Sequence, residues 1–351
     1  YQKVARLGAG ASSSDPLAAS STDPEIKNLA LSDIDFKLSE LKTIADQLAA
    51  LRVKKVQDIC QLDAIAEVAP ANARAIWEVR RGNGSDWLFE QMILAVSLRL
   101  QDNLDLQRRL DECHKIESYP RSESDLAAIL SQAGGDNIFP WANDDKWRII
   151  SRAVIKDEPV INLVSKKLGL EPRLMVSVLI VEQLRLYHTQ RELFEKFFKP
   201  LEVLASANKM AWGVMAIKEA TAIDIERNLK DGKSAFYLGS EYEHVLDFQT
   251  SDQNAERYER LTGNDHYYSY LYGGLLIRQV IQQWAIKGYD IRRRPEIIST
   301  IFNLGLSKSK PKDDPLVGGS ELTIGSANYT FGSLAHEFYY SGLLPEFSYE
   351  Q

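Results

Sequence analysis

The sequence predicts a mainly α-helical protein with one small β-hairpin near its C-terminus. Apolar residues recur at helical spacing through most of the chain, as Phe89, Ile93 and Val96 do. Two short segments near the C-terminus, ELTIG and NYTFG, have the composition of strands, and a Ser-Ala-Asn turn lies between them. We therefore expect helices to form the core and the hairpin to be a small addition to it.

Length and charge limit the class of protein. The chain of 351 residues is long enough for two domains, and its 44% content of hydrophobic residues is ordinary for a protein with a buried core. A net charge of −7 argues against a basic surface that binds nucleic acid. The longest apolar run, residues 174–181, is far shorter than the ~20 residues of a membrane-spanning helix. We therefore expect neither a nucleic-acid partner nor an integral membrane span.

The first part of the chain divides into a leader and a helical region. Residues 1–24 are small and polar, which predicts a flexible leader. Because the first residue is Tyr1 rather than Met, we expect that an upstream segment such as a signal peptide has been removed. Residues 25–116 predict a helical N-terminal domain, either a bundle or a cap, through which a protein partner could bind.

Helical patterns follow one another within this N-terminal domain. The first helix carries an apolar stripe with residues at seven-residue spacing, too short to establish a coiled coil. Proline near the start and glycine after the end mark the third helix. The stripe consists of Ile34, Leu41, Ile44, Leu48 and Leu51. The later helices are expected over residues 53–68, 70–81 and 85–113.

The two cysteines lie in the second and fourth of these helices. Cys60 and Cys113 either form one disulfide, which would suit an oxidising compartment, or remain two buried thiols. Residues 117–145 are rich in turn-forming residues and predict a linker that contains one short helix. The main domain boundary is expected here, and residues 146–351 form the second domain.

The second domain is predicted to be helical nearly throughout. Residues 160–180 also resemble a helix-turn-helix, but the second helix lacks the basic side chains that DNA binding requires. The polar residues 230–264 are predicted to be an insertion over a cleft. Successive helices are expected over residues 146–198, and single helices over residues 218–229, 265–288, 293–305 and 333–342.

The segment LMVSVLIVEQ, residues 174–183, predicts a buried helix that ends at Glu182. Eight residues with Ser177 as the only polar side chain precede this acid, and Pro172 suits the first turn of a helix. A carboxylate at the edge of an apolar core loses hydration, which raises its pKa toward the range that a general acid needs. The alternative is that Glu182 marks the point where the helix reaches solvent.

Three segments of the second domain, in this order, resemble the lytic transglycosylases and goose-type lysozymes. GLEPRLMVSVLIVEQ is similar to the family's helix that ends in the catalytic glutamate, here Glu182. AWGVMAI, followed by KEATA, resembles the family's Gly-Leu-Met-Gln-Ile segment and the helix start after it. SYLYGGLLIRQVIQQW, followed by IISTIFNLG, resembles the family's long glycine-containing helix and its Tyr-Asn-Ala-Gly signature. The resemblance covers about residues 150–310 and implies a lysozyme-like α-helical domain.

The resemblance also implies a set of site residues. Glu182 would be the catalytic acid, and four of the five substrate-binding candidates come from the matched segments. These candidates are Gly213, Met215, Asn303, Trp212 and Tyr268. For Met215 the alternative is core packing, and for Asn303 it is a place at a helix C-terminus.

Three positions depart from the family's pattern. Gln183 stands where the family has a serine after the glutamate. Ala216 replaces the glutamine of the Met-Gln pair, and Phe302 replaces the tyrosine of the signature. Several polar groups that would surround the acid are therefore different in this chain.

The implied reaction cleaves the β-1,4 bond between N-acetylmuramic acid and N-acetylglucosamine. In the family that this chain resembles, one glutamate protonates the glycosidic oxygen and then acts as base, while the sugar's 6-hydroxyl attacks to form a 1,6-anhydro product. An inverting lysozyme would instead need a second carboxylate roughly 6.5–9.5 Å away. Asp224, Glu241 and Glu243 are the candidates for it, with a solvated acidic loop as the alternative.

Aromatic side chains could stack on sugar faces, although core packing is the usual role of tyrosine. The candidates are Tyr187, Trp212, Tyr267, Tyr268 and Tyr272. The five histidines have no metal-binding spacing, and the sequence has no glycine-rich phosphate loop. We therefore expect neither a metal nor an organic cofactor.

The sequence thus predicts a periplasmic or secreted bacterial enzyme of lytic transglycosylase type that acts on the glycan strands of peptidoglycan. A first alternative is a catalytically impaired lysozyme-like domain that serves as a cell-wall glycan-binding or assembly module. A second alternative is a helical scaffold with no glycan function, in which Glu182 would be exposed to solvent.

Overall fold

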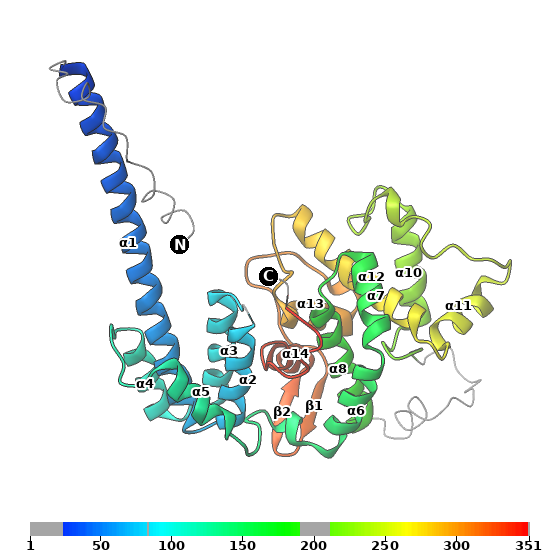
Figure 1. The fold of residues 1–351 in the computed structure, drawn as a ribbon. Helices are drawn as coiled ribbons and strands as arrows, with labels where there is room; N and C mark the ends of the chain where they lie inside the picture. The colour runs from blue at the N-terminus through cyan, green and yellow to red at the C-terminus, as the bar shows by residue number, and fades with distance from the viewer. Residues whose placement is uncertain (1–23, 83, 190–210, 350–351) are drawn as a thin grey trace. The chain divides into compact units, whose positions relative to one another are not determined.

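The protein is mainly α-helical and has a two-stranded antiparallel sheet near its C-terminus (Figure 1). The computed structural model describes the backbone of residues 24–82, 84–189 and 211–349, and within these ranges the side chains from residue 39 onward except residue 189. The predicted leader, residues 1–24, lies outside the described residues except for Pro24. The prediction of a mainly α-helical protein with a small β-hairpin near the C-terminus is confirmed. The predicted lysozyme-like arrangement of the second domain stays a prediction. Within the described part, no helix is both long enough and apolar enough to cross a membrane.

Contacts divide the chain into two units. One contains residues 1–58 and 116–119, and the other contains residues 59–115 and 120–351. Helix α1, Pro24–Ala66, begins in the first unit and ends in the second. The sequence predicted two helices over this range, which is wrong, because LRVKK at residues 51–55 contains no residue that breaks a helix. The predicted boundary at residues 117–145 stays a prediction.

Helices α2 to α5 follow in the second unit. Helix α2, Pro70–Arg81, begins with proline and is followed by Gly82, as predicted. The single helix predicted over residues 85–113 is wrong, because the chain forms α3, Asp86–Arg99, and α4, Leu104–Cys113. The side chain of Asn103 accepts a hydrogen bond from Leu106 N (3.0 Å) and starts a new helix after the break. The short helix predicted in the linker is α5, Glu123–Ser131.

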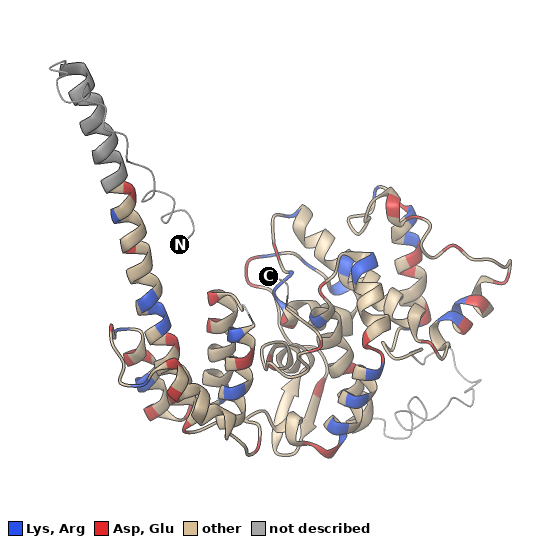
Figure 2. Ribbon diagram, in the orientation of Figure 1, with Lys and Arg blue, Asp and Glu red and all other residues tan. Residues whose placement is uncertain are grey.

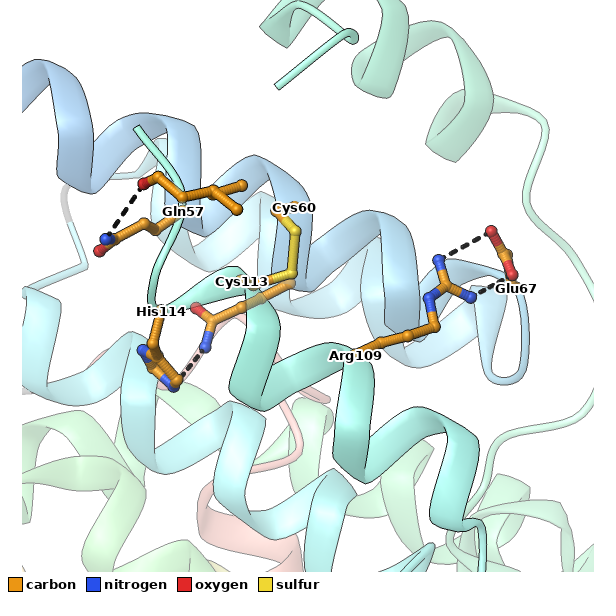
Figure 3. The surroundings of a disulfide bond; sticks show 8 residues. Gln57, Cys60, Glu67, Arg109, Cys113 and His114 are labelled. Atoms are coloured by element: carbon orange, nitrogen blue, oxygen red, sulfur yellow. Dashed lines mark hydrogen bonds and ion pairs between the residues drawn. A yellow bond between two sulfur atoms is a disulfide. The ribbon is translucent and has the colours of Figure 1, made fainter. Parts of the chain in front are cut away.

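A disulfide joins the end of α1 to α4 (Figure 3). Cys60 and Cys113 form a disulfide bond, and their Cα atoms are 5.6 Å apart. Of the two alternatives that the sequence left open, the disulfide is therefore present and the pair of free thiols is not. Beside the disulfide, the side-chain amide of Gln61 lies 3.1 Å from the ring nitrogen Nε2 of His114. Arg109 Nη2 on α4 donates to Glu67 Oε1 (2.9 Å), so a second contact joins α4 to the turn that follows α1.

The remaining elements surround two buried helices. Helix α8, Pro172–Thr189, packs against α6, α7, α13, α14 and the hairpin, and α12, Tyr267–Ile286, packs against α7, α10, α11 and α13. The helical neighbours are α6 Asp145–Lys156, α7 Glu158–Leu168, α10 Glu219–Lys230, α11 Gln253–Thr262, α13 Pro295–Leu304 and α14 Phe331–Tyr339. Three short 3₁₀ helices complete this part of the chain: η2 Pro140–Asn143, η3 Ser240–Tyr242 and η4 Leu306–Lys308. The polar segment predicted as an insertion contains η3 and α11.

The hairpin and the C-terminal segment are held to this core by specific contacts. Strand β1, Glu321–Ile324, pairs with β2, Ala327–Thr330, and their buried side chains alternate along β1. The fully buried Arg173 at the start of α8 donates hydrogen bonds to Phe338 O (3.1 Å), Tyr339 O (2.7 Å) and Leu343 O (2.9 Å). These bonds satisfy carbonyl groups at the end of α14 and fix the C-terminal segment against α8.

Candidate functional site

Helix α8 places Glu182 inside the core rather than at a helix end. The prediction that the helix ends at this acid is wrong, because α8 continues to Thr189. Arg185 and the apolar Leu184 and Leu186 extend the helix by good helical propensity, with no glycine or proline to stop it. Glu182 is 4% exposed, so the hypothesis of a solvent-exposed acid on a helical scaffold is contradicted.

The charge on Glu182 is balanced by one guanidinium. Arg185, one turn further along α8, donates from Nε (3.0 Å) and Nη2 (2.5 Å), both to Glu182 Oε2. Glu182 Oε1 receives no hydrogen bond from the described residues. Burial raises the pKa of the Glu182 carboxyl above its usual value, and the positive charges of Arg185 and Lys218 oppose that rise. The carboxyl group therefore holds a proton to higher pH than an exposed glutamate does.

A tight turn of residues 212–217 lies next to this part of α8. Trp212 and Ile217 exchange backbone hydrogen bonds of 2.8 and 3.0 Å. Gly213 and Ala216 both have positive φ, +70° and +50°, which closes the turn. Gln183, the neighbour of Glu182, donates from its side-chain amide to Val214 O (2.5 Å). Gln183 thus ties the turn to helix α8, which carries Glu182.

Gly213 is the residue that the backbone of this turn requires. A Cβ atom at this position would lie 2.2 Å from Leu261 O and 2.5 Å from Ser269 Oγ. Ser269 Oγ also accepts a hydrogen bond from Met215 N (3.1 Å), which holds the turn against α12. Gly213 therefore permits the turn to pack closely against Leu261 and Ser269. This packing accounts for a glycine at position 213, and no contact with a substrate is needed to explain it.

Met215 and Asn303 have structural partners. Met215 is fully buried, and its side chain fills the space that a Cβ atom on Gly273 of α12 would occupy. In this structure Met215 takes the core-packing role. Asn303 Oδ1 accepts hydrogen bonds from Ser320 N (2.8 Å) and Ser320 Oγ (2.9 Å), so it fixes the loop that leads into β1. Phe302, beside it, is 8% exposed and lies in the core.

The aromatic candidates differ in their exposure. Tyr272 is fully buried and donates from its hydroxyl to Glu226 Oε1 (2.6 Å), so its ring cannot stack on a sugar. The other four candidates are partly exposed. Trp212 packs edge-on against Tyr258, with ring centroids 5.3 Å apart. The ring of Tyr268 is covered on one face by the Arg260 guanidinium at 4.7 Å.

The two remaining tyrosine candidates each contact a lysine. The Lys146 ammonium lies 4.8 Å from the centroid of the Tyr187 ring. Tyr267 accepts a hydrogen bond from Lys167 Nζ (3.0 Å). Both tyrosine rings remain partly exposed to solvent.

Two of the three candidates for a second carboxylate have other partners, and the third is exposed to solvent. Asp224 pairs with Arg227 on the same helix (2.5 Å). Glu243 accepts a hydrogen bond from the Tyr237 hydroxyl (2.5 Å), and Glu241 is exposed. In the part of the chain that the structure describes, Asp224, Glu241 and Glu243 make no hydrogen bond or ion pair with Glu182. The arrangement around Glu182 is therefore that of one acid with one guanidinium.

A cavity of about 670 Å³ lies at the C-terminal end of α8. His188 lines it together with residues of the hairpin and of the first turn of α14, among them Thr323, Asn328 and Ser333. His188 follows Glu182 by six residues, or about 9 Å along a helix axis. Hydroxyl, amide and imidazole groups of this kind form hydrogen bonds with sugar hydroxyls. Among the described residues, no group of three or more His, Cys, Asp or Glu side chains could hold a metal ion.

Comparison with protein-family models, with curated proteins and with solved structures found no match to this chain. The structure brings Glu182, Gln183 and the turn of residues 212–217 together. Sequence reasoning missed Arg185, although its three-residue spacing after Glu182 on a helix could have identified it. It also missed Ser269, which has no signal in the sequence because its role depends on the approach of α12 to the turn.

Proposed function

We propose that this chain is a peptidoglycan-cleaving enzyme of the lytic transglycosylase type, with a lysozyme-like domain in residues 146–351. Glu182 is its single general acid and base. The observation that carries the proposal is the burial of Glu182, with a raised pKa, beside a turn that its neighbour Gln183 holds in place. A buried carboxyl group with a raised pKa is the form that a general acid needs near neutral pH.

In the proposed reaction, protonated Glu182 gives its proton from Oε1 to the glycosidic oxygen, and the bond from that oxygen to C1 of the muramic acid breaks. Oε2 keeps its two hydrogen bonds from Arg185, which stabilise the carboxylate that forms. The N-acetyl group of the substrate shares the positive charge at C1. The carboxylate then takes the proton of the 6-hydroxyl as that oxygen attacks C1, which restores the acid and gives the 1,6-anhydro product.

Two further observations support a site on a glycan strand outside the cytoplasm. The polar cavity at the end of α8 offers hydrogen-bonding groups next to the acid-bearing helix. The disulfide between Cys60 and Cys113 is typical of proteins in an oxidising compartment such as the periplasm or the exterior of the cell.

The test is digestion of purified sacculi by the wild-type chain and by two matched variants. Glu182→Gln keeps the size of the side chain and removes the acid, so release of soluble muropeptides should fall by about 100-fold or more. Glu337→Gln is the control, because Glu337 is partly buried and also has a raised pKa, but it accepts a hydrogen bond from Trp141 on η2 and lies 3.6 Å from Arg99. If both variants lose activity equally while remaining folded, or neither does, Glu182 is not the acid.

A second candidate function is glycan binding without catalysis. Phe302 lies in the core and lacks the hydroxyl of the tyrosine in the pattern that this chain resembles, and Ala216 lacks the amide of the corresponding glutamine, so groups that would assist the acid are absent. A sacculus pull-down separates the two functions. Binding without any soluble product supports the binding module, whereas product that depends on Glu182 supports the enzyme.

A further inference from the structure

Helix α6 presents a row of basic and apolar side chains to solvent. The helix packs against α8, and its buried residues are Ile150 and Val154. At about 100° of rotation per residue, the opposite side of the helix holds three cations and two isoleucines. These five exposed residues are Arg148, Ile149, Arg152, Ile155 and Lys156. Figure 2 shows basic residues at intervals along α6.

Helix α7 repeats this arrangement. It packs against α8 and α12, and the side away from its buried residues is exposed to solvent. That side holds Pro159, Leu163, Lys166 and Lys167. We call the exposed residues named here for α6 and α7 the basic face.

A single residue, Asp157, joins the two helices. Its carboxylate accepts hydrogen bonds from His266 (2.6 Å) and from the Tyr270 hydroxyl (2.7 Å). Because these partners lie just before α12 and in its first turn, the carboxylate is directed toward α12 and lies outside the basic face. The same bonds hold the joint between α6 and α7 in place, so the basic face is one rigid surface.

The cations of the basic face are largely without acidic partners. Arg152, Lys156 and Lys166 make no hydrogen bond or ion pair with the residues that the structure describes. Lys167 donates to the hydroxyl of Tyr267, which carries no charge at neutral pH. The basic face is therefore positive, although the chain as a whole has a net charge of −7.

The acids of the two helices do not neutralise this charge. Asp145 lies 3.7 Å from Arg148, but both side chains are mostly exposed, and ion pairs of this kind contribute little. Glu158, the first residue of α7, is partly buried and accepts a hydrogen bond from Asn162 (2.6 Å). Helix α6 thus has four cations to one acid, and α7 has two cations to one acid.

The apolar members of the basic face identify the kind of partner. Ile149, Ile155 and Leu163 are 47%, 39% and 58% exposed, and they alternate with the cations. A soluble polyanion would leave these side chains in water. The boundary between lipid headgroups and acyl chains would cover them, while lysine and arginine side chains extend their charged ends to the phosphates. A basic helix face with interspersed apolar residues is typical of a membrane-surface contact.

We propose that the basic face binds the surface of a membrane that contains anionic lipids. Arg148, Arg152 and Lys156 lie at the lipid phosphates, and the apolar side chains enter the boundary below the headgroups. Each cation at such a surface strengthens binding by about fivefold. Repulsion from acids elsewhere on the chain is screened beyond about 8 Å at physiological ionic strength. The contact does not involve Glu182, so it holds independently of the reaction proposed for that acid.

The first test is co-sedimentation of the full-length chain with lipid vesicles. The chain should bind vesicles of equal parts phosphatidylglycerol and phosphatidylcholine, more weakly as the salt concentration rises, and should not bind phosphatidylcholine alone. Arg152→Gln with Lys156→Gln removes two cations of the basic face and should weaken binding by about 30-fold. Lys308→Gln with Lys310→Gln removes the same charge from two exposed lysines after α13 and is the matched control, with unchanged binding.

The second test determines which face meets the membrane, with one added thiol that carries an environment-sensitive fluorophore. The two native cysteines are bonded to each other and do not react with the label. The emission of labelled Ile149→Cys should shift to shorter wavelength on addition of the anionic vesicles, and that of labelled Lys308→Cys should not.

Four results would overturn the proposal. These are no binding to the anionic vesicles, equal binding to the neutral ones, equal losses in the two double variants, and equal fluorescence shifts at the two labelled positions. Poly-L-glutamate separates a membrane from a soluble polyanion, because it offers negative charge without an apolar layer. Binding to this polymer as tight as binding to the vesicles would identify a polyanion as the partner and would contradict the membrane contact.

Discussion

Replacement of Gly213 by alanine tests how the turn beside the acid is built. The backbone at Gly213 has φ of +70°, where a residue with a Cβ atom costs about 1–2 kcal/mol. The added Cβ atom would also lie 2.2 Å from Leu261 O, and overpacking of this kind typically costs about 1–3 kcal/mol. We therefore expect Gly213→Ala to lower the free energy of unfolding by about 2–5 kcal/mol.

Gly169 provides the matched control for that experiment. It ends helix α7 with a φ of +56°, but a Cβ atom there would meet no atom within 4 Å. Gly169→Ala should therefore cost only the conformational part, about 1–2 kcal/mol. The difference between the two variants isolates the steric contact with Leu261 and Ser269.

Urea unfolding followed by far-ultraviolet circular dichroism measures both variants against the wild-type chain. A midpoint for Gly213→Ala well below that of Gly169→Ala agrees with the structure. Equal midpoints for the two variants would refute the close packing of the turn against α12. The turn would then not be a rigid support for the segment that Gln183 contacts.

Three further predictions concern charge and the disulfide. Arg185→Met removes a charge that lowers the pKa of Glu182, so the acid should stay protonated to higher pH and the alkaline limb of the pH–activity profile should move upward. Replacement of both Cys60 and Cys113 by serine removes a disulfide that joins residues 53 positions apart. In the chain-entropy model this should lower the free energy of unfolding by about 4 kcal/mol, which urea unfolding under matched conditions measures. Burial raises the pKa of the Asp157 carboxyl, but hydrogen bonds from His266, the residue before α12, and from Tyr270 on α12 outweigh that effect and hold the pKa below its usual value. Its contribution to stability should therefore be complete above the unfolded-state pKa of about 3.9 and disappear as the pH falls through the lower folded-state pKa, so wild type and Asp157→Asn should converge in stability in strong acid.

Local signals in the sequence located the elements that have strong start and stop residues. Pro70 and Gly82 bound α2, and Pro295 and Gly305 bound α13, because proline and glycine restrict helix ends directly. The break between α3 and α4 was missed, since only the side-chain cap of Asn103 marks it and asparagine also occurs within helices.

The candidate site was predictable only in part. The burial of Glu182 follows from the apolar run before it, which is a local property. The role of Asn303 was not predictable, because its partner Ser320 comes close only after α13 and the loop before β1 have packed. Met215 likewise finds its place through the absence of a side chain on Gly273, a contact between segments far apart in the sequence.

The most direct measurement of the central claim is the product that the chain releases from sacculi. Soluble fragments from a digest at equal protein concentration are separated and weighed by mass spectrometry, for wild type and for Glu182→Gln. We predict muropeptides with 1,6-anhydro ends from the wild-type chain and about 100-fold less from the variant. Equal release by the two proteins, or no release by a folded wild-type chain, would contradict the assignment of Glu182 as the catalytic acid.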